Sequence, residues 1–321
     1  MKAIVREKYC GPDELRLGDV DQPVIGDDDV LVRVAVAGVD QGVWHLVTGL
    51  PRLIRLAGFG VRRPKNPVPG MDVAGTVSAV GANVTRFQVG DEVFGSGQST
   101  YAEYAKAPAK NLVHKPANVS FEEAAAVPIS ALAALQGLRK GNLATGQRVL
   151  VIGAAGGVGH FAVQLVAAAG AEVTGICSTA KMDFVRSLGA DDVLDYTREE
   201  ITDGGRRYDL ILDTGGNRPL RQLRRALTPR GTLVIVGAEV GGWRQGIERQ
   251  LVGLLVNPFI KQNVRSYVSG PTEADLQYLA DQLAAGTLRA AVDRTFPLSQ
   301  AGVAITYMRE GKARGKVVLT V

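Results

Sequence analysis

The 321-residue sequence is poor in cysteine and contains no long apolar run, and each shortage excludes a class of protein. Its two cysteines, Cys10 and Cys177, are too few for a disulfide framework or for a structural zinc site with four cysteine ligands. The apolar runs fall short of the roughly 20 residues that span a bilayer. The N-terminal segment MKAIVREKYCG also lacks the apolar core of a signal peptide. We therefore expect a cytoplasmic protein with no membrane partner.

The formal net charge is +5, yet the sequence carries no recognised nucleic-acid motif. The basic residues gather in clusters that lack interleaved aromatic side chains. We therefore expect no nucleic-acid partner and interpret the clusters as a solvated face with a bias toward an anionic cofactor. The clusters comprise Arg62, Arg63 and Lys65; Arg206 and Arg207; and Arg221, Arg224, Arg225 and Arg230.

The segment 148–181 has the pattern of a strand, a turn of small residues, a helix and a second strand. In the turn, Ala154, Gly156 and Gly159 occupy the positions of a G-x-G-x-x-G fingerprint, with alanine in place of the first glycine. Such a turn brings a bare backbone and a helix N-terminus close to a pyrophosphate. The pattern indicates a dinucleotide site; a turn that only packs a helix against a sheet is the alternative.

An acidic residue is missing where an NAD-dependent enzyme would use one. In such enzymes an Asp or Glu about 20 residues beyond the glycines binds the 2′-hydroxyl of the ribose. The end of the second strand here offers Ser178, Thr179 and Lys181, with Tyr196 further along the chain. A hydroxyl donor and an ammonium group suit a 2′-phosphate, which a carboxylate would repel. The sequence therefore predicts NADPH as the cofactor.

The pattern of the chain changes near residue 120. Short strand patterns with glycine-rich turns precede it, with a helical or irregular segment at 43–61 that we interpret as cover for a cleft. Ser120 and Glu123 have the spacing of a capping box before a long helical pattern that Pro128 breaks. Strands and helices then alternate over 148–236, which predicts a doubly wound parallel sheet. A helix over 273–285 and strand-like pieces at 295–297 and 316–321 end the chain.

Several segments together resemble the medium-chain dehydrogenase/reductase superfamily and, within it, the zinc-independent quinone oxidoreductase-like (zeta-crystallin-like) branch. They are MKAIV, PGMDVAGTVSAVGANVTRFQVGDEVFG, VLVIGAAGGVGHFAVQL, LGADDVLDY and GKVVLTV. The resemblance implies an α/β chain with a GroES-like β-rich domain over residues 1–120, completed by about 270–321. It also implies a Rossmann NADPH-binding domain over 121–269, a cofactor between the two domains, and a homodimer.

The zinc ligands of the alcohol dehydrogenases in this superfamily are not matched. Those enzymes place a cysteine after the strand of the type VAVAGVD and a His-Glu pair after the glycine of PG-x-x-x-AG. This chain has Asp40 at the first position, and Met71 with Asp72 at the second. Because methionine is not a usual zinc ligand, we expect no metal.

The resemblance also assigns the cofactor contacts. A lysine after the second strand and a tyrosine after LGA-x-x-x-x-x contact the 2′-phosphate in the family, and the turn backbone holds the pyrophosphate. The predicted cofactor-binding residues are Ala154, Ala155, Gly156, Gly157, Val158, Gly159, Cys177, Ser178, Lys181, Tyr196, Thr214, Gly237 and Ala238.

Without zinc to polarise a carbonyl, we expect hydride transfer from NADPH to a small, hydrophobic, electron-poor acceptor, either a quinone or an α,β-unsaturated carbonyl compound. Asp40 and His45 are the candidate catalytic residues for supplying a proton, and water is an alternative source. Two other functions stay open at this point. One is a carbonyl or alcohol oxidoreductase in which Asp40 or His45 replaces the metal, and the other is a non-catalytic NADPH-binding protein.

Overall fold

The computed structural model describes residues 1–52, 55–216, 218–236, 257 and 260–321. The chain divides into two compact units: unit 1 comprises Met1–Leu132 with Gly270–Val321, and unit 2 comprises Ala133–Ser269. The first boundary falls inside helix α3 (Pro128–Lys140). Among the helices of the described ranges, none combines the length and apolar character that a membrane crossing requires.

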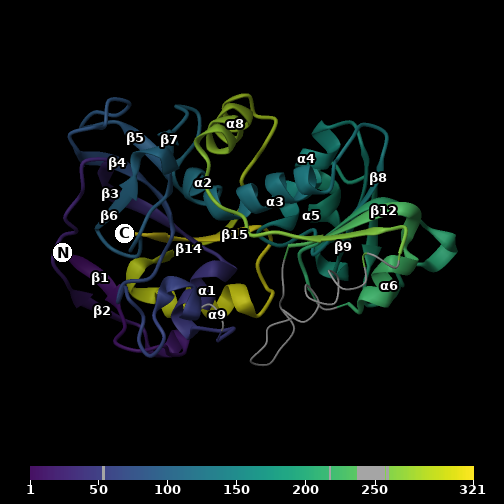
Figure 1. Cartoon of the computed structure of the whole chain (residues 1–321), viewed down its shortest axis with the longest axis horizontal. Coiled ribbons are helices and arrows are strands. Elements are labelled where there is room, and N and C mark those ends of the chain that lie inside the picture. The colour runs from purple at the N-terminus through teal and green to yellow at the C-terminus, as the bar shows by residue number, and fades with distance from the viewer. Residues whose placement is uncertain (53–54, 217, 237–256, 258–259) are drawn as a thin grey trace. The chain divides into compact units, whose positions relative to one another are not determined.

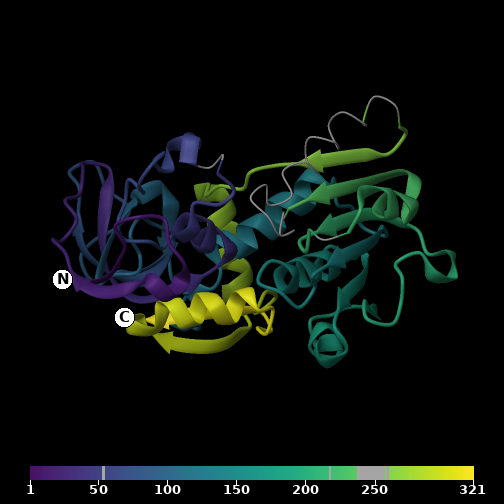
Figure 2. The same cartoon turned by 90° about the horizontal axis from the view of Figure 1, so that it is seen from below.

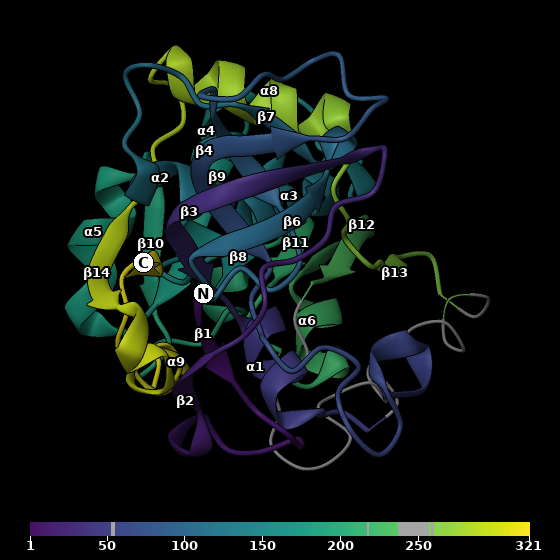
Figure 3. The same cartoon turned by 90° about the vertical axis from the view of Figure 1, so that its left-hand side faces the viewer.

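Unit 1 is built on a seven-stranded sheet (Figure 3). Its order is β14 (Val292–Pro297), β15 (Lys316–Thr320), β3 (Asp29–Val39), β4 (Asp72–Val80), β5 (Glu92–Ser96) and β7 (Leu112–His114), with β6 (Tyr104–Pro108) paired to β3. All pairs are antiparallel except β14 with β15. A separate antiparallel pair joins β1 (Lys2–Val5) to β2 (Arg16–Asp19). The sequence patterns predicted no strand at the position of β2. Buried aliphatic residues of β3, β4 and β15 form the core of this unit.

The helices of unit 1 flank this sheet. They are α1 (Gln41–Thr48), a π-helical turn η2 (Arg55–Phe59), α2 (Phe121–Ala125), α8 (Glu273–Ala284) and α9 (Ala301–Arg309), with short 3-10 turns η1 (Pro12–Glu14), η3 (Ala109–Asn111) and η7 (Leu298–Gln300). The predicted capping box is confirmed, because Ser120 Oγ accepts from the Glu123 amide at 3.1 Å and Glu123 Oε2 accepts from the Ser120 amide at 2.9 Å. The predicted break at Pro128 is confirmed: α2 ends at Ala125, and Pro128 begins α3, where the first turn needs no amide donor. Figure 2 shows α9 beside the strand pair β14 and β15, where the sequence patterns gave no helix.

Unit 2 is the expected doubly wound parallel sheet (Figure 1). Its strand order is β10 (Asp192–Asp195), β9 (Glu172–Cys177), β8 (Arg148–Ile152), β11 (Tyr208–Asp213), β12 (Leu227–Ile235) and β13 (Asn263–Ser266), all parallel. Helices α4 (Gly159–Ala168), α5 (Met182–Ser187) and α6 (Leu220–Arg225), with turns η4 (Thr179–Lys181) and η5 (Asp203–Gly205), connect the strands. The chain reverses its direction of progress across the sheet between β8 and β11, which is where folds of this class bind ligands.

Candidate functional site

The turn after β8 is shaped by a glycine that the fingerprint does not include. Gly153 has φ of 77°, a conformation that side chains disfavour, and its carbonyl accepts from the Gly156 amide at 2.9 Å. Ala154, at the first position of the fingerprint, is fully buried and donates its amide to the Ile176 carbonyl at 3.0 Å. The residue with the left-handed backbone thus directly precedes the fingerprint. A glycine directly after the buried strand was the signal available for this position.

Two further glycines of the turn have different surroundings. A Cβ added at Gly159, the first residue of α4, would lie 2.1 Å from the Gly153 carbonyl oxygen, so the helix packs against the turn at this point. A Cβ at Gly156 would meet only that same oxygen, at 3.3 Å. The backbone at Gly156 is therefore open on its other sides, at the N-terminal end of a ten-residue helix. Bare backbone beside a helix N-terminus suits a pyrophosphate. Of the remaining predicted turn residues, Ala155 is buried, and Gly157 and Val158 are half-buried.

The predicted 2′-phosphate residues meet at the carboxyl ends of β9 and β10. Ser178 and Lys181 are half-buried, and the Lys181 amide donates to the Ser178 carbonyl at 2.9 Å. The exposed Tyr196 donates its amide to the Cys177 carbonyl at 3.2 Å, which places it beside the same strand end. Cys177 itself is buried, and burial raises the pKa of its thiol to about 11. This cysteine therefore packs as a neutral thiol.

Asp195 is an acidic residue at the carboxyl end of β10 that the sequence patterns did not indicate. Asp195, the last residue of β10, accepts from the Thr179 hydroxyl and from both the amide (2.9 Å) and the hydroxyl (2.7 Å) of Thr197. Arg198 Nε lies 3.7 Å from its carboxylate. The Thr179 bond and then the Thr197 bonds hold the pKa of Asp195 below its usual value. Its charge is thus engaged by neighbours, and the Thr179 hydroxyl is already committed to it.

Thr214 lies directly after β11, at the switch point of the sheet. Its amide (3.2 Å) and its hydroxyl (2.7 Å) both donate to the Ile152 carbonyl at the end of β8. The structure thus brings the turn, the β9 edge and Thr214 to one edge of the parallel sheet. Gly237 and Ala238, the other predicted cofactor contacts, lie outside the described residues.

Asp40 directly precedes α1 in unit 1 and His45 lies within that helix, and the two contact different groups. Asp40 is buried and caps the helix, because its Oδ1 accepts from the Val43 amide at 3.0 Å. His45 Nδ1 lies 2.6 Å from the Leu50 carbonyl oxygen. That contact places the ring proton on Nδ1 and leaves Nε2 as an acceptor in the neutral ring. Burial lowers the pKa of His45, and nearby Arg309 lowers it further.

The next turn fixes the end of α1. Gly49, with φ of 62°, ends the helix, and Arg55 donates from Nε to the Gly49 carbonyl at 2.8 Å and from Nη2 to the Thr48 carbonyl at 3.3 Å. A cation at a helix C-terminus also interacts favourably with the helix dipole. The Arg309 guanidinium lies over the Trp44 ring at 4.1 Å. The position of His45 is thus set from both ends of a short helix.

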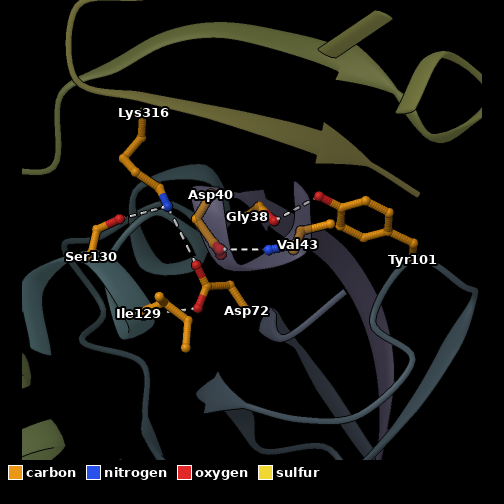
Figure 4. Close-up of polar contacts among 8 residues, drawn as sticks. All are labelled: Gly38, Asp40, Val43, Asp72, Tyr101, Ile129, Ser130 and Lys316. Atoms are coloured by element: carbon orange, nitrogen blue, oxygen red, sulfur yellow. Dashed lines mark hydrogen bonds and ion pairs between the residues drawn. The ribbon is translucent and has the colours of Figure 1, made fainter. Parts of the chain in front are cut away.

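The two segments that hold zinc in the alcohol dehydrogenases have other partners here. Asp72 is fully buried, its Oδ2 lying 3.4 Å from Lys316 Nζ and its Oδ1 accepting from the Ile129 amide at 2.9 Å (Figure 4). Its neighbour Met71 is half-buried. Over the described ranges, no group of three or more His, Cys, Asp or Glu side chains could hold a metal ion.

Comparisons with known proteins agree on one family. Family models match twice: the alcohol dehydrogenase GroES-like domain over residues 26–117, and the zinc-binding dehydrogenase domain over residues 188–319. The chain is 30% identical over 318 residues to a chloroplast envelope quinone oxidoreductase homolog of Arabidopsis thaliana, covering 92% of this chain and 91% of that protein. It is 31% identical over 335 residues to the NADPH-dependent alkenal/one oxidoreductase of the same plant, covering 99% and 79%.

The fold comparison extends over the whole chain. The quinone oxidoreductase from Coxiella burnetii superposes with a TM-score of 0.85 at 26% identity, covering 100% of this chain and 99% of that one. The GroES-like and Rossmann assignments are confirmed by the sheets described above and by these matches. The chain therefore belongs to the medium-chain dehydrogenase/reductase superfamily, in its quinone oxidoreductase-like branch, a family of oxidoreductases.

Proposed function

We propose that this protein transfers a hydride from NADPH to a small electron-poor acceptor, a quinone or an α,β-unsaturated carbonyl compound. The observation that carries the proposal is the open glycine turn at the switch point of unit 2, with Ser178 and Lys181 at the neighbouring strand end. The names of the relatives, a quinone oxidoreductase homolog and an NADPH-dependent alkenal/one oxidoreductase, support the acceptor classes.

The choice of NADPH over NADH rests on charge. Lys181 and the hydroxyl of Ser178 provide a cation and a donor where a 2′-phosphate would lie, and Tyr196 supplies a further hydroxyl at the same edge. The carboxylate of Asp195 would repel a phosphate, but two threonine hydroxyls and Arg198 already engage it. The turn backbone at residues 155–159 would then hold the pyrophosphate.

The protein's own groups position the acceptor and manage one proton. NADPH held by the turn and by Ser178 and Lys181 would supply a hydride for the β-carbon of an enone, and the α-carbon would then require one proton from another source. His45, neutral with its proton on Nδ1, offers Nε2 as an acceptor. We therefore assign it the relay of a proton that originates in water, rather than the donation of a stored one. Asp40 would affect His45 indirectly, because it caps the helix that carries His45.

We further propose that this chemistry proceeds without zinc. The reason is that the residues at the two positions of the zinc ligands already have other partners. Asp72 is paired with Lys316, and Oδ1 of Asp40 accepts from an amide of α1. Conjugation in the acceptor spreads the developing negative charge, which removes the need for a Lewis acid. The homodimer that the resemblance implies and the cytoplasmic location expected from the sequence stay predictions.

The test is NADPH oxidation against a panel of quinones, enones and unconjugated ketones, with NADH in parallel and with or without a chelator. The proposal predicts turnover of quinones or enones with NADPH, at a rate that the chelator leaves unchanged. Reduction of ketones alone would favour the carbonyl oxidoreductase, and binding of NADPH without turnover of any acceptor would favour a non-catalytic protein. Loss of activity on chelation would contradict the zinc-free assignment.

A further inference from the structure

Three ionisable side chains from distant segments are buried together in unit 1 (Figure 4). Asp72 at the start of β4 is 0% exposed, Lys316 at the start of β15 is 1% exposed, and Asp40 before α1 is 5% exposed. Lys316 Nζ donates to Ser130 Oγ at 2.9 Å and lies 3.4 Å from Asp72 Oδ2. We call Asp40, Asp72 and Lys316 the buried charge cluster.

One oxygen of this cluster lacks a donor. Oδ1 of Asp40 accepts from the Val43 amide, whereas Oδ2 is buried with no hydrogen-bond partner among the described residues. Another carboxyl group lies beside it, because Asp72 interacts with Asp40 and the two side chains are drawn together in Figure 4. Two ionised carboxylates cannot bond each other. A single proton between them would supply the missing donor.

The charge count leads to the same result. Two carboxylates and one ammonium group would leave a net negative charge in the interior, and an uncompensated buried charge is strongly unfavourable. Binding one proton makes the cluster neutral. Two adjacent carboxyls that cannot both ionise commonly share a proton in this way.

We infer that Asp40 and Asp72 share one proton beside Lys316 at neutral pH, and that this proton holds the start of α1 in place. Asp72 then acts as a positioning residue: it keeps Asp40 in its capping geometry, and α1 carries His45. The last step rests on the proposed function, since it gives His45 a part in proton transfer.

The titration of Asp72 is consistent with this arrangement. Burial raises its pKa to about 8, the ammonium group of Lys316 opposes that rise, and Asp40 adds to it. The Tyr101 hydroxyl donates to the Gly38 carbonyl at 3.1 Å, and burial raises the pKa of Tyr101 well above its usual value, so it stays neutral. Half-buried charged or titratable groups on the elements packed here are Glu122 and Glu123 of α2, Asp29 of β3 and His45 of α1. Exposed ones include Arg33 of β3 and Glu92 of β5, and α3 ends in Arg139 and Lys140.

Loss of the proton should disturb α1. Above about pH 8 both carboxylates would be ionised, with the one ammonium group paired to Asp72. Their repulsion would act on the N-cap of the helix. We therefore expect the turnover number to fall on the alkaline side through this cluster rather than through His45, whose pKa is lowered.

The most direct test is infrared spectroscopy of the whole protein in its native state. The wild type should show the carbonyl stretching band of a protonated carboxyl group at pH 7, and this band should disappear with a midpoint near pH 8. Asp40→Asn supplies an amide donor to Asp72 without a proton and should abolish the band, as should Asp72→Asn. Asp21→Asn, an exposed carboxylate, is the matched control and should keep it. Absence of the band in the wild type, or its survival in Asp40→Asn, would overturn the inference.

A second readout is the pH dependence of unfolding. Because the folded pKa lies above the unfolded value of about 3.9, the folded wild type holds a proton that the unfolded chain releases, so its stability falls as pH rises from about 5 to about 8. Asp40→Asn should lose this dependence by about one proton per molecule. An unchanged slope in that variant would contradict the shared proton.

Activity separates this inference from the proposed function. The turnover number of Asp40→Asn should be flat from pH 7 to beyond pH 8, where that of the wild type falls. A fall identical in both would contradict the positioning role. A wild type that shows the titrating band but reduces no acceptor would support the shared proton and contradict the proposed function.

Discussion

The glycine turn of unit 2 and the buried charge cluster of unit 1 are two polar sites built in opposite ways. The turn uses backbone alone: Gly153 supplies the left-handed conformation and Gly159 the close approach of α4. The cluster uses side chains from distant segments, since Asp72 and Lys316 alone are 244 positions apart and Asp40 precedes both. The first leaves an open polar surface for a ligand, whereas the second satisfies its charges internally. A binding surface can thus be made from local sequence, while a charge-neutral interior requires distant residues to match.

Removing the cation of the cluster should have the largest effect. Lys316→Met leaves the carboxylates without their ammonium partner, and breaking a buried pair costs about 3–5 kcal/mol. Urea unfolding at neutral pH measures the loss. Lys312→Met, which breaks an exposed pair with Glu310, is the control and should cost less than about 1 kcal/mol. Equal costs for the two variants would show that the buried pair has no special role in stability.

The glycine turn should separate stability from binding. Gly159→Ala places a Cβ against the Gly153 carbonyl and should destabilise the protein by about 1–3 kcal/mol through overpacking. Gly156→Ala meets a single contact at 3.3 Å, so it should cost less stability while it weakens NADPH binding. Thermal unfolding and fluorescence titration with NADPH measure the two effects. Tight NADPH binding by a stable Gly156→Ala would contradict the assignment of the pyrophosphate to this backbone.

The edge of β9 should decide cofactor preference. Lys181→Ala should weaken NADPH binding about tenfold, which corresponds to about 1.4 kcal/mol, and leave NADH binding unchanged. The double variant Ser178→Asp with Lys181→Ala should prefer NADH, because a carboxylate repels the 2′-phosphate and binds the ribose hydroxyl. Lys261→Ala, an exposed lysine of the same unit, serves as the control. Unchanged NADPH selectivity in the double variant would refute the 2′-phosphate site.

The smallest effect concerns the cation near His45. Arg309→Gln should raise the pKa of His45, because the guanidinium lowers it in the native protein. Since the folded pKa lies below the unfolded value of about 6.5, the neutral ring stabilises the fold above that pH, and the contribution is lost as the pH falls. NMR titration of the ring protons checks the shift. An unchanged pKa of His45 in Arg309→Gln would show that solvent screens the Arg309 guanidinium from the ring.

Local patterns predicted the glycine turn and the parallel sheet, because a strand followed by small residues and a helix constrains its own geometry. The fingerprint did not indicate the part of Gly153, since it fixes the spacing of small residues but not which residue takes a positive φ. Helix α9 was not predicted because Gly302 weakens its helical pattern. The glycine is needed there for packing, since a Cβ would lie 2.2 Å from the Pro12 carbonyl oxygen. The pairing of Asp72 with Lys316 leaves no local signal at all.

Isotope transfer tests the central claim most directly. NADPH that carries deuterium at the transferable position of the nicotinamide is mixed with the protein and an enone, and the product is analysed by mass spectrometry and NMR. Direct hydride transfer predicts deuterium at the β-carbon and a solvent proton at the α-carbon. A reduced product without deuterium at the β-carbon, or oxidation of NADPH with no reduced enone or quinone, would contradict the proposed reaction.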